Sequence, residues 1–149
     1  MANELAKQSI KRYEGLRLKA YLCPVGKWTV GWGQTAGVGP TTVWTLEQAE
    51  RNLDEAVIGL RSNIRFLVRK DTTEQQMQAF ISLVYNIGYT AFKQSTVLRL
   101  HNAYAGKDAM DKAFLMWIKG TVKGKKVTLK GLVTRRWSEA QIYSSGVLI

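Results

Sequence analysis

Residues 13 to 35 read YEGLRLKAYLCPVGKWTVGWGQT, and the texture of the chain changes within them. β-forming side chains are interrupted there by Pro24 and a series of glycines, a pattern that is typical of a small hairpin or three-stranded sheet. Glu14 is the only carboxylate between Glu4 and Glu47, and it stands where the preceding segment ends. The sequence therefore predicts an acidic side chain at the border between a helix and a glycine-rich sheet.

Apolar residues at helical spacing flank this sheet on both sides. Before it, residues 2 to 13 predict a short amphipathic helix. After it, Thr45 is followed three residues later by Gln48, which is the signature of a capping box. Apolar side chains then recur every three to four positions and predict one long helix over about residues 45 to 68. Such a helix would join the sheet to the rest of the chain.

The remainder of the sequence has mostly helical texture. Asp71, with Glu74 three residues on, predicts the start of a helix that is apolar nearly all round until Gly88, as expected of a central buried helix. Residues 119 to 131, KGTVKGKKVTLKG, predict a mobile basic loop or hairpin with a solvated surface. Shorter helices are expected over residues 96 to 104, 108 to 118 and 132 to 144.

The order of these elements indicates an α+β chain with two lobes. Its 149 residues and 46% hydrophobic content suit one domain with a real core. We expect a small β lobe over about residues 14 to 45, a larger helical lobe over about 1 to 13 and 68 to 149, and the linking helix between them. A cleft is expected where the lobes meet.

The composition excludes some kinds of site and bears on where the protein starts. A net charge of +11 attracts some polyanion, without naming nucleic acid, lipid or bacterial envelope. Cys23 is the single cysteine and His101 the single histidine, which excludes an intramolecular disulfide and a multi-histidine metal site. No apolar run has the length of a membrane span or the character of a signal peptide, so the sequence predicts a protein that starts in a cytoplasm.

Glu14 is a candidate general acid. Cleavage of a glycosidic bond requires a proton donor for the leaving oxygen, and a carboxylic acid at the mouth of a cleft serves when partial burial raises its pKa. The residue type alone leaves a second interpretation open, because a glutamate at a helix terminus is commonly a solvated surface group.

The spacing around Glu14 resembles that of a known family. Glu14, eight residues, Cys23, five residues and Thr29 reproduce the Glu, Asp or Cys, and Thr pattern of the phage lysozymes of glycoside hydrolase family 24. Further stretches look like family motifs in the same order: EGLRLKAY (14 to 21), TVGWGQT (29 to 35), FISLVYNIG (80 to 88), Ser95 to Leu98, Trp117 and GLVTRRWSEAQIY (131 to 143). Several ordered matches in one chain are more specific than any one of them.

The resemblance implies a lysozyme-like fold and a muramidase, an endolysin that hydrolyses the β-1,4 bond between N-acetylmuramic acid and N-acetylglucosamine. By that resemblance Glu14 is the general acid, Cys23 is the base or the group that orients water, and Thr29 fixes the attacking water. Cys23 stands where many members have Asp. A thiol with an ordinary pKa of about 8.5 is mostly protonated at neutral pH and is a poorer base, and a small buried packing residue is the alternative interpretation.

Five further residues are candidates for substrate binding. Arg135 and Arg136 resemble the late arginine pair of the family, one member of which can pair with the acid; a solvated charge pair on a helix is the alternative. Gln34 falls in the sheet beside the acid, where its amide could meet a sugar hydroxyl. Tyr85 and Asn86 could line the cleft, although core and capping roles fit them as well.

Three other side chains are aromatic or titratable candidates for the same site. Trp28 and Trp32 could stack on sugar faces, and hairpin packing is the simpler interpretation. His101 falls well inside the helical lobe, where we expect no catalytic part for it.

Competing functions remain open at this stage. A lytic transglycosylase could use the same acid on the same bond, although the water-holding Thr29 favours hydrolysis. A non-enzymatic cationic protein that binds envelope or nucleic acid, or that lyses bacteria through amphipathic segments, is permitted by the charge, but no nucleic-acid-binding signature is visible. The muramidase hypothesis requires no cofactor, and a monomer is the default expectation. The resemblance implies a holin that lets the enzyme pass from the host cytoplasm to the periplasm and cell wall.

Overall fold

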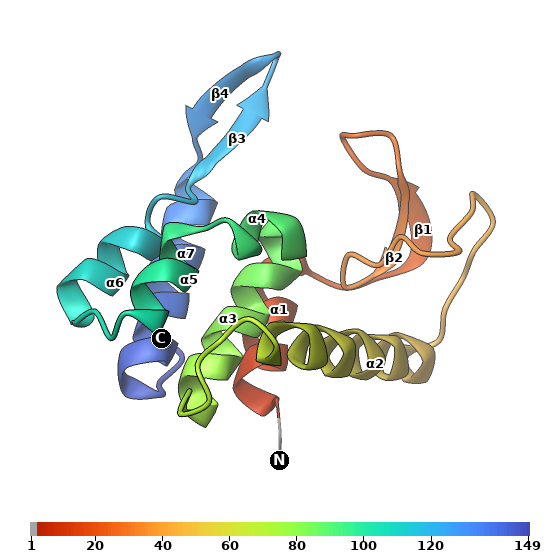
Figure 1. Cartoon of the computed structure of the whole chain (residues 1–149). Helices are drawn as coiled ribbons and strands as arrows, with labels where there is room; N and C mark the ends of the chain where they lie inside the picture. Colours follow the sequence, from red (N-terminus) through yellow and green to blue (C-terminus); the bar gives the residue numbers. More distant parts are fainter. Residues whose placement is uncertain (1–2) are drawn as a thin grey trace.

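The computed structural model describes residues 3 to 149, and helices make up most of it (Figure 1). Residues 1 and 2 lie outside the described residues. Both belong to the predicted helical lobe, and residue 2 is the first residue of the first predicted helix. The elements follow in the order α1 (Glu4–Glu14), β1 (Arg17–Leu22), β2 (Trp28–Gly31), α2 (Leu46–Arg65), α3 (Glu74–Ile87), α4 (Tyr89–Lys93), α5 (Thr96–Asn102), α6 (Lys107–Phe114), β3 (Lys119–Val122), β4 (Lys125–Thr128) and α7 (Lys130–Ser145).

The glycine-rich segment forms a small antiparallel sheet. Strands β1 and β2 pair with Tyr21 opposite Thr29, and the register is irregular between Arg17 and Tyr21. A third segment flanks β1 through one bridge, between Lys19 and Val43, and does not become a full strand. Of the two predicted forms, the structure has the hairpin, with a third segment joined to β1 by a single bridge.

Helix α2 begins where its capping signature predicts. The Thr45 hydroxyl accepts a hydrogen bond from the backbone N–H of Gln48 (3.1 Å), and the Gln48 side chain accepts one from the N–H of Thr45 (2.8 Å). The helix has 20 residues and hence a length of about 30 Å. It runs from the sheet to the start of α3 and links the two parts of the molecule (Figure 1).

The start of α3 differs from the prediction. Thr73 caps this helix, in a capping box with Gln76, and its extended backbone (φ −74°, ψ 163°) is that of an N-cap. Asp71 instead pairs with Arg69 (2.6 Å) and accepts a hydrogen bond from the hydroxyl of Tyr104 (2.9 Å). The prediction that Asp71 starts the helix was wrong because the chain holds a second capping pair two residues later.

Helix α3 is the central element, as its apolar pattern predicts. It packs against α1, α2 and α7, and eight consecutive residues from Met77 to Val84 are buried. Phe80 lies at the middle of an aromatic cluster to which α4, α5, α6 and α7 each contribute a ring: Phe92, His101, Phe114 and Tyr143. Helices α5, α6 and α7 lie within a few residues of their predicted ranges, whereas α4 was not predicted.

The basic segment near the C-terminus forms a regular hairpin. Strands β3 and β4 pair antiparallel from Lys119 opposite Thr128 to Val122 opposite Lys125. The hairpin stands out from the helices just before α7 (Figure 1). Within residues 3 to 149, no helix is both long enough and apolar enough to cross a membrane.

Candidate active site

Glu14 is the last residue of α1 and lies at the edge of a cleft. Gly15 ends the helix with a φ of +71°, a conformation that glycine adopts without steric cost. The Glu14 side chain keeps 23% of its surface exposed. The cleft has a volume of about 420 Å³ and is lined by Tyr13, Glu14, Asn86, Leu129, Gly131, Leu132 and Arg135.

A buried arginine holds one oxygen of this carboxyl group. The side chain of Arg135 is 3% exposed, and its Nη1 donates to Oε2 of Glu14 at 2.6 Å. Its Nη2 donates to the carbonyl of Ser82 at 3.0 Å, and its Nε to Oε2 of Glu139 at 3.1 Å. All three contacts fix the guanidinium, so the pairing that the family resemblance implied is present and ties α7 to the end of α1.

Glu139 stands behind this arginine, and the sequence reasoning missed it. Its carboxylate is fully buried and accepts hydrogen bonds from Ser82 Oγ (2.5 Å) and Arg136 Nη1 (2.5 Å) as well as from Arg135. Ser82 also meets Ser9 of α1 at 2.8 Å. A glutamate three and four residues after two arginines is a helical ion-pair signal that was available in the sequence.

Arg136 holds neighbouring groups of the site in place. It is fully buried, and its guanidinium donates to the carbonyl of Trp117 (2.9 Å), to Glu139 and to the side-chain oxygen of Asn86. Burial lowers the pKa of this guanidinium, and the Glu139 charge opposes the shift. These contacts support a structural role; direct binding of substrate by Arg136 stays a prediction. Asn86 lines the cleft beside Glu14 and is oriented by Arg136.

The second oxygen of Glu14 faces Gly33, just after strand β2. A Cβ atom at Gly33 would stand 3.0 Å from Oε1, and the φ of Gly33 is +84°. A side chain is excluded at Gly31 for a similar reason, because a Cβ atom there would stand 2.8 Å from the ring of Trp44. Gly33 therefore lets the segment after β2 approach Glu14 closely, and Gly31 lets β2 approach the ring of Trp44.

Cys23 and Thr29 lie together at the turn between β1 and β2. The backbone N–H of Cys23 donates to the carbonyl of Lys27 (2.9 Å), and the Thr29 hydroxyl donates to the same carbonyl (3.0 Å). A backbone hydrogen bond from Lys27 lowers the pKa of the Cys23 thiol; partial burial opposes this, and the Thr29 hydroxyl adds to it. Thr29 is nearly buried and Cys23 is half-buried.

Gln34 and Tyr85 form a bridge between the sheet and α3. The Gln34 amide donates to the Tyr85 hydroxyl (2.6 Å), which in turn donates to the backbone carbonyl of Trp32. Burial raises the pKa of Tyr85, and the nearby charge of Glu14 adds to the shift. Both residues line a groove of about 290 Å³ beside Gly33. This position is compatible with sugar contact, which stays a prediction.

The surroundings of Trp28, Trp32 and His101 indicate structural roles for these residues. Trp32 is buried in the core, and Trp28 pairs with Leu22 across the sheet. His101 is buried; its Nδ1 meets the Tyr143 hydroxyl (2.7 Å) and its Nε2 the Thr72 hydroxyl (2.8 Å). Burial lowers its pKa to about 4.

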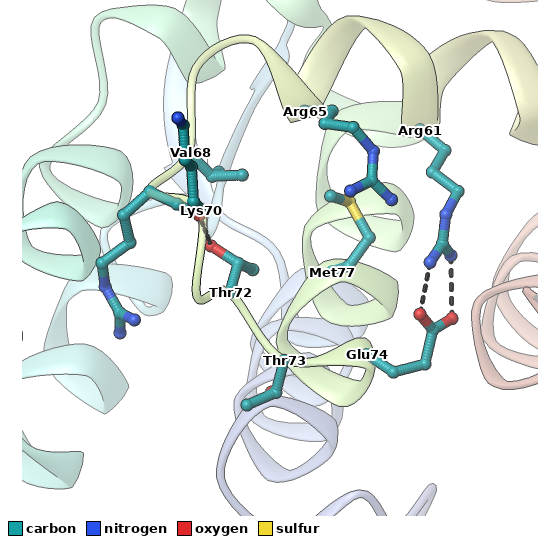
Figure 2. Close-up of a pocket in the computed structure, with 9 residues that line it drawn as sticks. Arg61, Arg65, Val68, Lys70, Thr72, Thr73, Glu74 and Met77 are labelled. Atoms are coloured by element: carbon teal, nitrogen blue, oxygen red, sulfur yellow. Dashed lines mark hydrogen bonds and ion pairs between the residues drawn. The ribbon is translucent and has the colours of Figure 1, made fainter.

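A larger cavity lies elsewhere, between α2 and the start of α3, and Figure 2 shows it. Its volume is about 540 Å³, and it is lined by Arg61, Arg65, Val68, Arg69, Lys70, Thr72, Thr73, Glu74 and Met77. Glu74 is the one carboxylate in that lining, and Arg61 binds both of its oxygens. Met77 and Asn86 are nine residues, or about 13 Å, apart on α3. This cavity therefore offers no free acid and is separate from the cleft at Glu14.

The geometry at Glu14 defines a class of protein. A partly exposed carboxyl group at a helix end, bound by a buried arginine at the edge of a cleft, is suited to act as the general acid of a glycosidase. Among residues 3 to 149, no group of three or more histidine, cysteine or acidic side chains is arranged to hold a metal ion.

Comparison with known proteins names the family. The family model described as phage lysozyme matches residues 11 to 139, and the chain belongs to this family. It is 43% identical over 138 residues to an endolysin of Acyrthosiphon pisum secondary endosymbiont phage 1, covering 91% of this chain and 92% of that one. It spans about half the length of the endolysins of Bacillus phages B103 and PZA, to which it is 38% and 37% identical.

Solved structures agree with this assignment. The endolysin from Escherichia coli O157:H7 phage FAHEc1 superposes with a TM-score of 0.88 at 38% identity, covering 98% of this chain and 94% of that one. The muramidase domain of SpmX from Asticaccaulis excentricus superposes with a TM-score of 0.87 at 30% identity, covering 95% and 96%. The expected lysozyme-like fold is thereby confirmed.

Proposed function

We propose that this chain is an endolysin that hydrolyses the β-1,4 bond between N-acetylmuramic acid and N-acetylglucosamine in peptidoglycan, with Glu14 as the general acid. The observation that carries the proposal is the placement of Glu14. Arg135 binds one carboxyl oxygen at 2.6 Å, and Gly33 leaves space around the other at the edge of a 420 Å³ cleft. Relatives named endolysin and a neighbour named muramidase support the same reaction.

In the proposed reaction Glu14 gives its proton to the glycosidic oxygen as the bond from that oxygen to C1 breaks. A water on the opposite face of the sugar forms the new bond to C1 and passes a proton to the group that activates it. Inversion requires about 6.5 to 9.5 Å between the two protein groups, enough to admit that water, and gives an α product from a β-linked substrate.

Cys23 and Thr29 are the proposed holders of this water. The Thr29 hydroxyl donates to the Lys27 carbonyl, which leaves its lone pairs free to accept a hydrogen bond from water. The lowered pKa of the Cys23 thiol increases the fraction of thiolate, the form that can take a proton. Asn86 in the cleft, and Gln34 and Tyr85 in the groove beside Gly33, are proposed to contact the sugars.

The family resemblance also underlies a proposal about release. We propose that the chain acts as a monomeric single domain, that it accumulates in the host cytoplasm, and that a holin opens the inner membrane before it reaches the cell wall. Lysis of cells that express the chain with and without a holin tests this proposal. Equal lysis in both cases would contradict it.

The decisive experiment replaces Glu14 by Gln and measures the release of reducing ends from purified peptidoglycan. Gln keeps the shape of the side chain and can still accept from Arg135, but it has no proton to give. Activity should fall on the order of a hundredfold to ten-thousandfold. Glu47→Gln, at an exposed position on α2, is the matched control and should retain activity.

Three outcomes would contradict the proposal. Activity above a tenth of the original in Glu14→Gln, at an unchanged Tm, would remove Glu14 from the role of acid. Anhydro sugar ends in the products, detected by mass spectrometry, would make the enzyme a lytic transglycosylase. Killing of bacteria that does not depend on Glu14 would support the non-enzymatic cationic alternative.

A further inference from the structure

The cleft at Glu14 continues into a second cavity under the β3–β4 hairpin. The second cavity has a volume of about 270 Å³ and shares Asn86 and Leu132 with the cleft. Its other lining residues are Ile87, Trp117, Lys119, Lys126 and Arg136. A polymer bound at Glu14 therefore lies next to a space whose outer wall is the basic hairpin.

The strand register places two lysines on the wall of this cavity. Lys119 pairs with Thr128, and Thr121 pairs with Lys126, so Lys119 and Lys126 project from the same face of the hairpin. On the opposite face, a Cβ atom at Gly120 would stand 2.4 Å from Leu129, a residue of the Glu14 cleft. The base of the hairpin is thus packed closely against the cleft.

These two cations have no negative partner within the described chain. Neither Lys119 nor Lys126 forms an ion pair with a carboxylate of residues 3 to 149. The stretch from 119 to 131 holds five lysines and no acidic residue. Arg136, at the same cavity, already binds Glu139, Asn86 and the Trp117 carbonyl. The lysines are therefore free to bind an anion from outside.

Trp117, which lines this cavity, has an unsatisfied hydrogen-bond donor. The indole Nε1 of Trp117 is buried and has no hydrogen-bond partner among residues 3 to 149. A buried donor without an acceptor is rare in proteins, because it loses its hydrogen bond to water without a replacement. Because Trp117 lines the cavity, its indole N–H signal can report binding there.

We propose that the β3–β4 hairpin is a binding site for carboxylate groups of the peptides that are attached to the glycan, with Lys119 and Lys126 as its cations. The inference rests on the proposed function, which brings the glycan into the adjoining cleft. Peptides in peptidoglycan hang from the muramic acid residues and carry free carboxylates. Attachment to a sugar in the cleft holds such a carboxylate beside the hairpin at high effective concentration.

The experiment compares two pairs of lysines. Lys119→Gln with Lys126→Gln removes the two lysines that line the cavity. Lys123→Gln with Lys125→Gln removes the same charge from the turn and the opposite face of the hairpin and is the matched control. The substrates are soluble glycan strands that carry peptides and the same strands after an amidase has removed the peptides.

Removal of Lys119 and Lys126 should raise KM for the peptide-bearing strands by about threefold to thirtyfold, the range for two partly exposed charge pairs, with kcat within twofold. KM for the stripped strands should stay within twofold, and the control pair should behave alike on both substrates. Lys126→Arg should retain the low KM. Equal effects of the two double variants, or equal effects on the two substrates, would overturn the proposal and leave only general charge attraction.

A binding measurement separates this inference from the proposed function. A disaccharide that carries a tetrapeptide is titrated into nitrogen-15-labelled protein while the indole N–H signal of Trp117 is followed; a Trp117→Phe variant assigns the signal. A shift that the Lys119 and Lys126 variant loses supports the site even if the protein cleaves neither strand. An unmoved signal, or the same shift in both proteins, contradicts the site even if the glycan is cleaved.

Discussion

Gly33 shows how one residue can matter through the atom it lacks. Its positive φ of +84° and the 3.0 Å approach of Glu14 Oε1 to the position of a Cβ are separate requirements, one of the backbone and one of the site. Gly37 shares only the first, with a φ of +69° and no atom within 4 Å of that position. The two glycines therefore make a matched pair.

Gly33→Ala and Gly37→Ala should each lower the free energy of unfolding by about 1 to 2 kcal/mol, the cost of a left-handed conformation at a residue with a Cβ. Only Gly33→Ala should also lower kcat, by about tenfold or more, because it displaces the acid. Urea denaturation and peptidoglycan turnover measure the two effects. Equal kcat in both variants would mean that the approach of Gly33 to Glu14 has no part in catalysis.

Cys23 is a candidate through the atom it carries, because its thiolate can take a proton from the attacking water. If it takes a proton from the attacking water, Cys23→Asp should remain active, Cys23→Ala should lose at least about tenfold in kcat, and thiol-blocking reagents should inhibit the original protein. The anomer of the first product, read by NMR, should be α. Full activity in Cys23→Ala would leave Cys23 as a packing residue, and a covalent sugar adduct with a β product would make it a nucleophile.

At the scale of elements, α7 docks on α3 through charge as well as through apolar packing. Glu139 is fully buried between Arg135 and Arg136, and Ser82 of α3 donates to its carboxylate. A buried ion cluster of this kind loses far more when one partner is removed than it adds to stability as a whole, because the remaining charges stay out of water. The position of Glu14, the proposed acid, therefore depends on a carboxylate on another helix.

Glu139→Gln should lower the free energy of unfolding by about 3 to 5 kcal/mol, since two buried guanidinium groups lose their shared anion. Glu55→Gln, at an exposed position of α2, should change it by less than about 0.5 kcal/mol. Urea denaturation at neutral pH measures both. A small effect at Glu139 would show that the arginines find other partners or water.

At the scale of the whole molecule, the aromatic cluster around Phe80 joins four of the later helices to α3. His101 is the member of this cluster that can gain a proton below neutral pH, and burial holds it neutral, with its pKa lowered to about 4. In an unfolded chain the pKa of histidine is about 6.5. The folded state therefore binds fewer protons than the unfolded state between these values, and stability falls as pH falls through that window.

His101→Gln should abolish this part of the pH dependence. Between about pH 7 and pH 4 the original protein should lose at most about 3 kcal/mol more than the variant in the free energy of unfolding. Above about pH 7 the titration contributes nothing to the slope, and both proteins should show the same slope. Urea denaturation at pH 8, 6 and 4 measures the difference. Parallel pH profiles would show that His101 titrates normally in the fold.

Short-range sequence patterns predicted most of the helices. Apolar periodicity predicted α2 and α3, and the Thr45 and Gln48 pair predicted the first residue of α2, because both signals act within one or two helical turns. The same local rules failed at Asp71, where a competing capping pair lies nearby. The resemblance of their spacing to the phage lysozyme pattern made Glu14, Cys23 and Thr29 candidates, and the structure places the latter two together at the turn of the sheet.

Contacts between distant residues were decided by the tertiary structure alone. Arg135 meets Glu14 across 121 positions of sequence, and Ser82 meets Glu139 across 57. No local rule says which of two adjacent arginines turns toward the acid, because that depends on how α7 lies against α3 and α1. The lysines of the hairpin could be counted in the sequence, but only strand register and the docking of the hairpin on the cleft determine that Lys119 and Lys126 line a cavity.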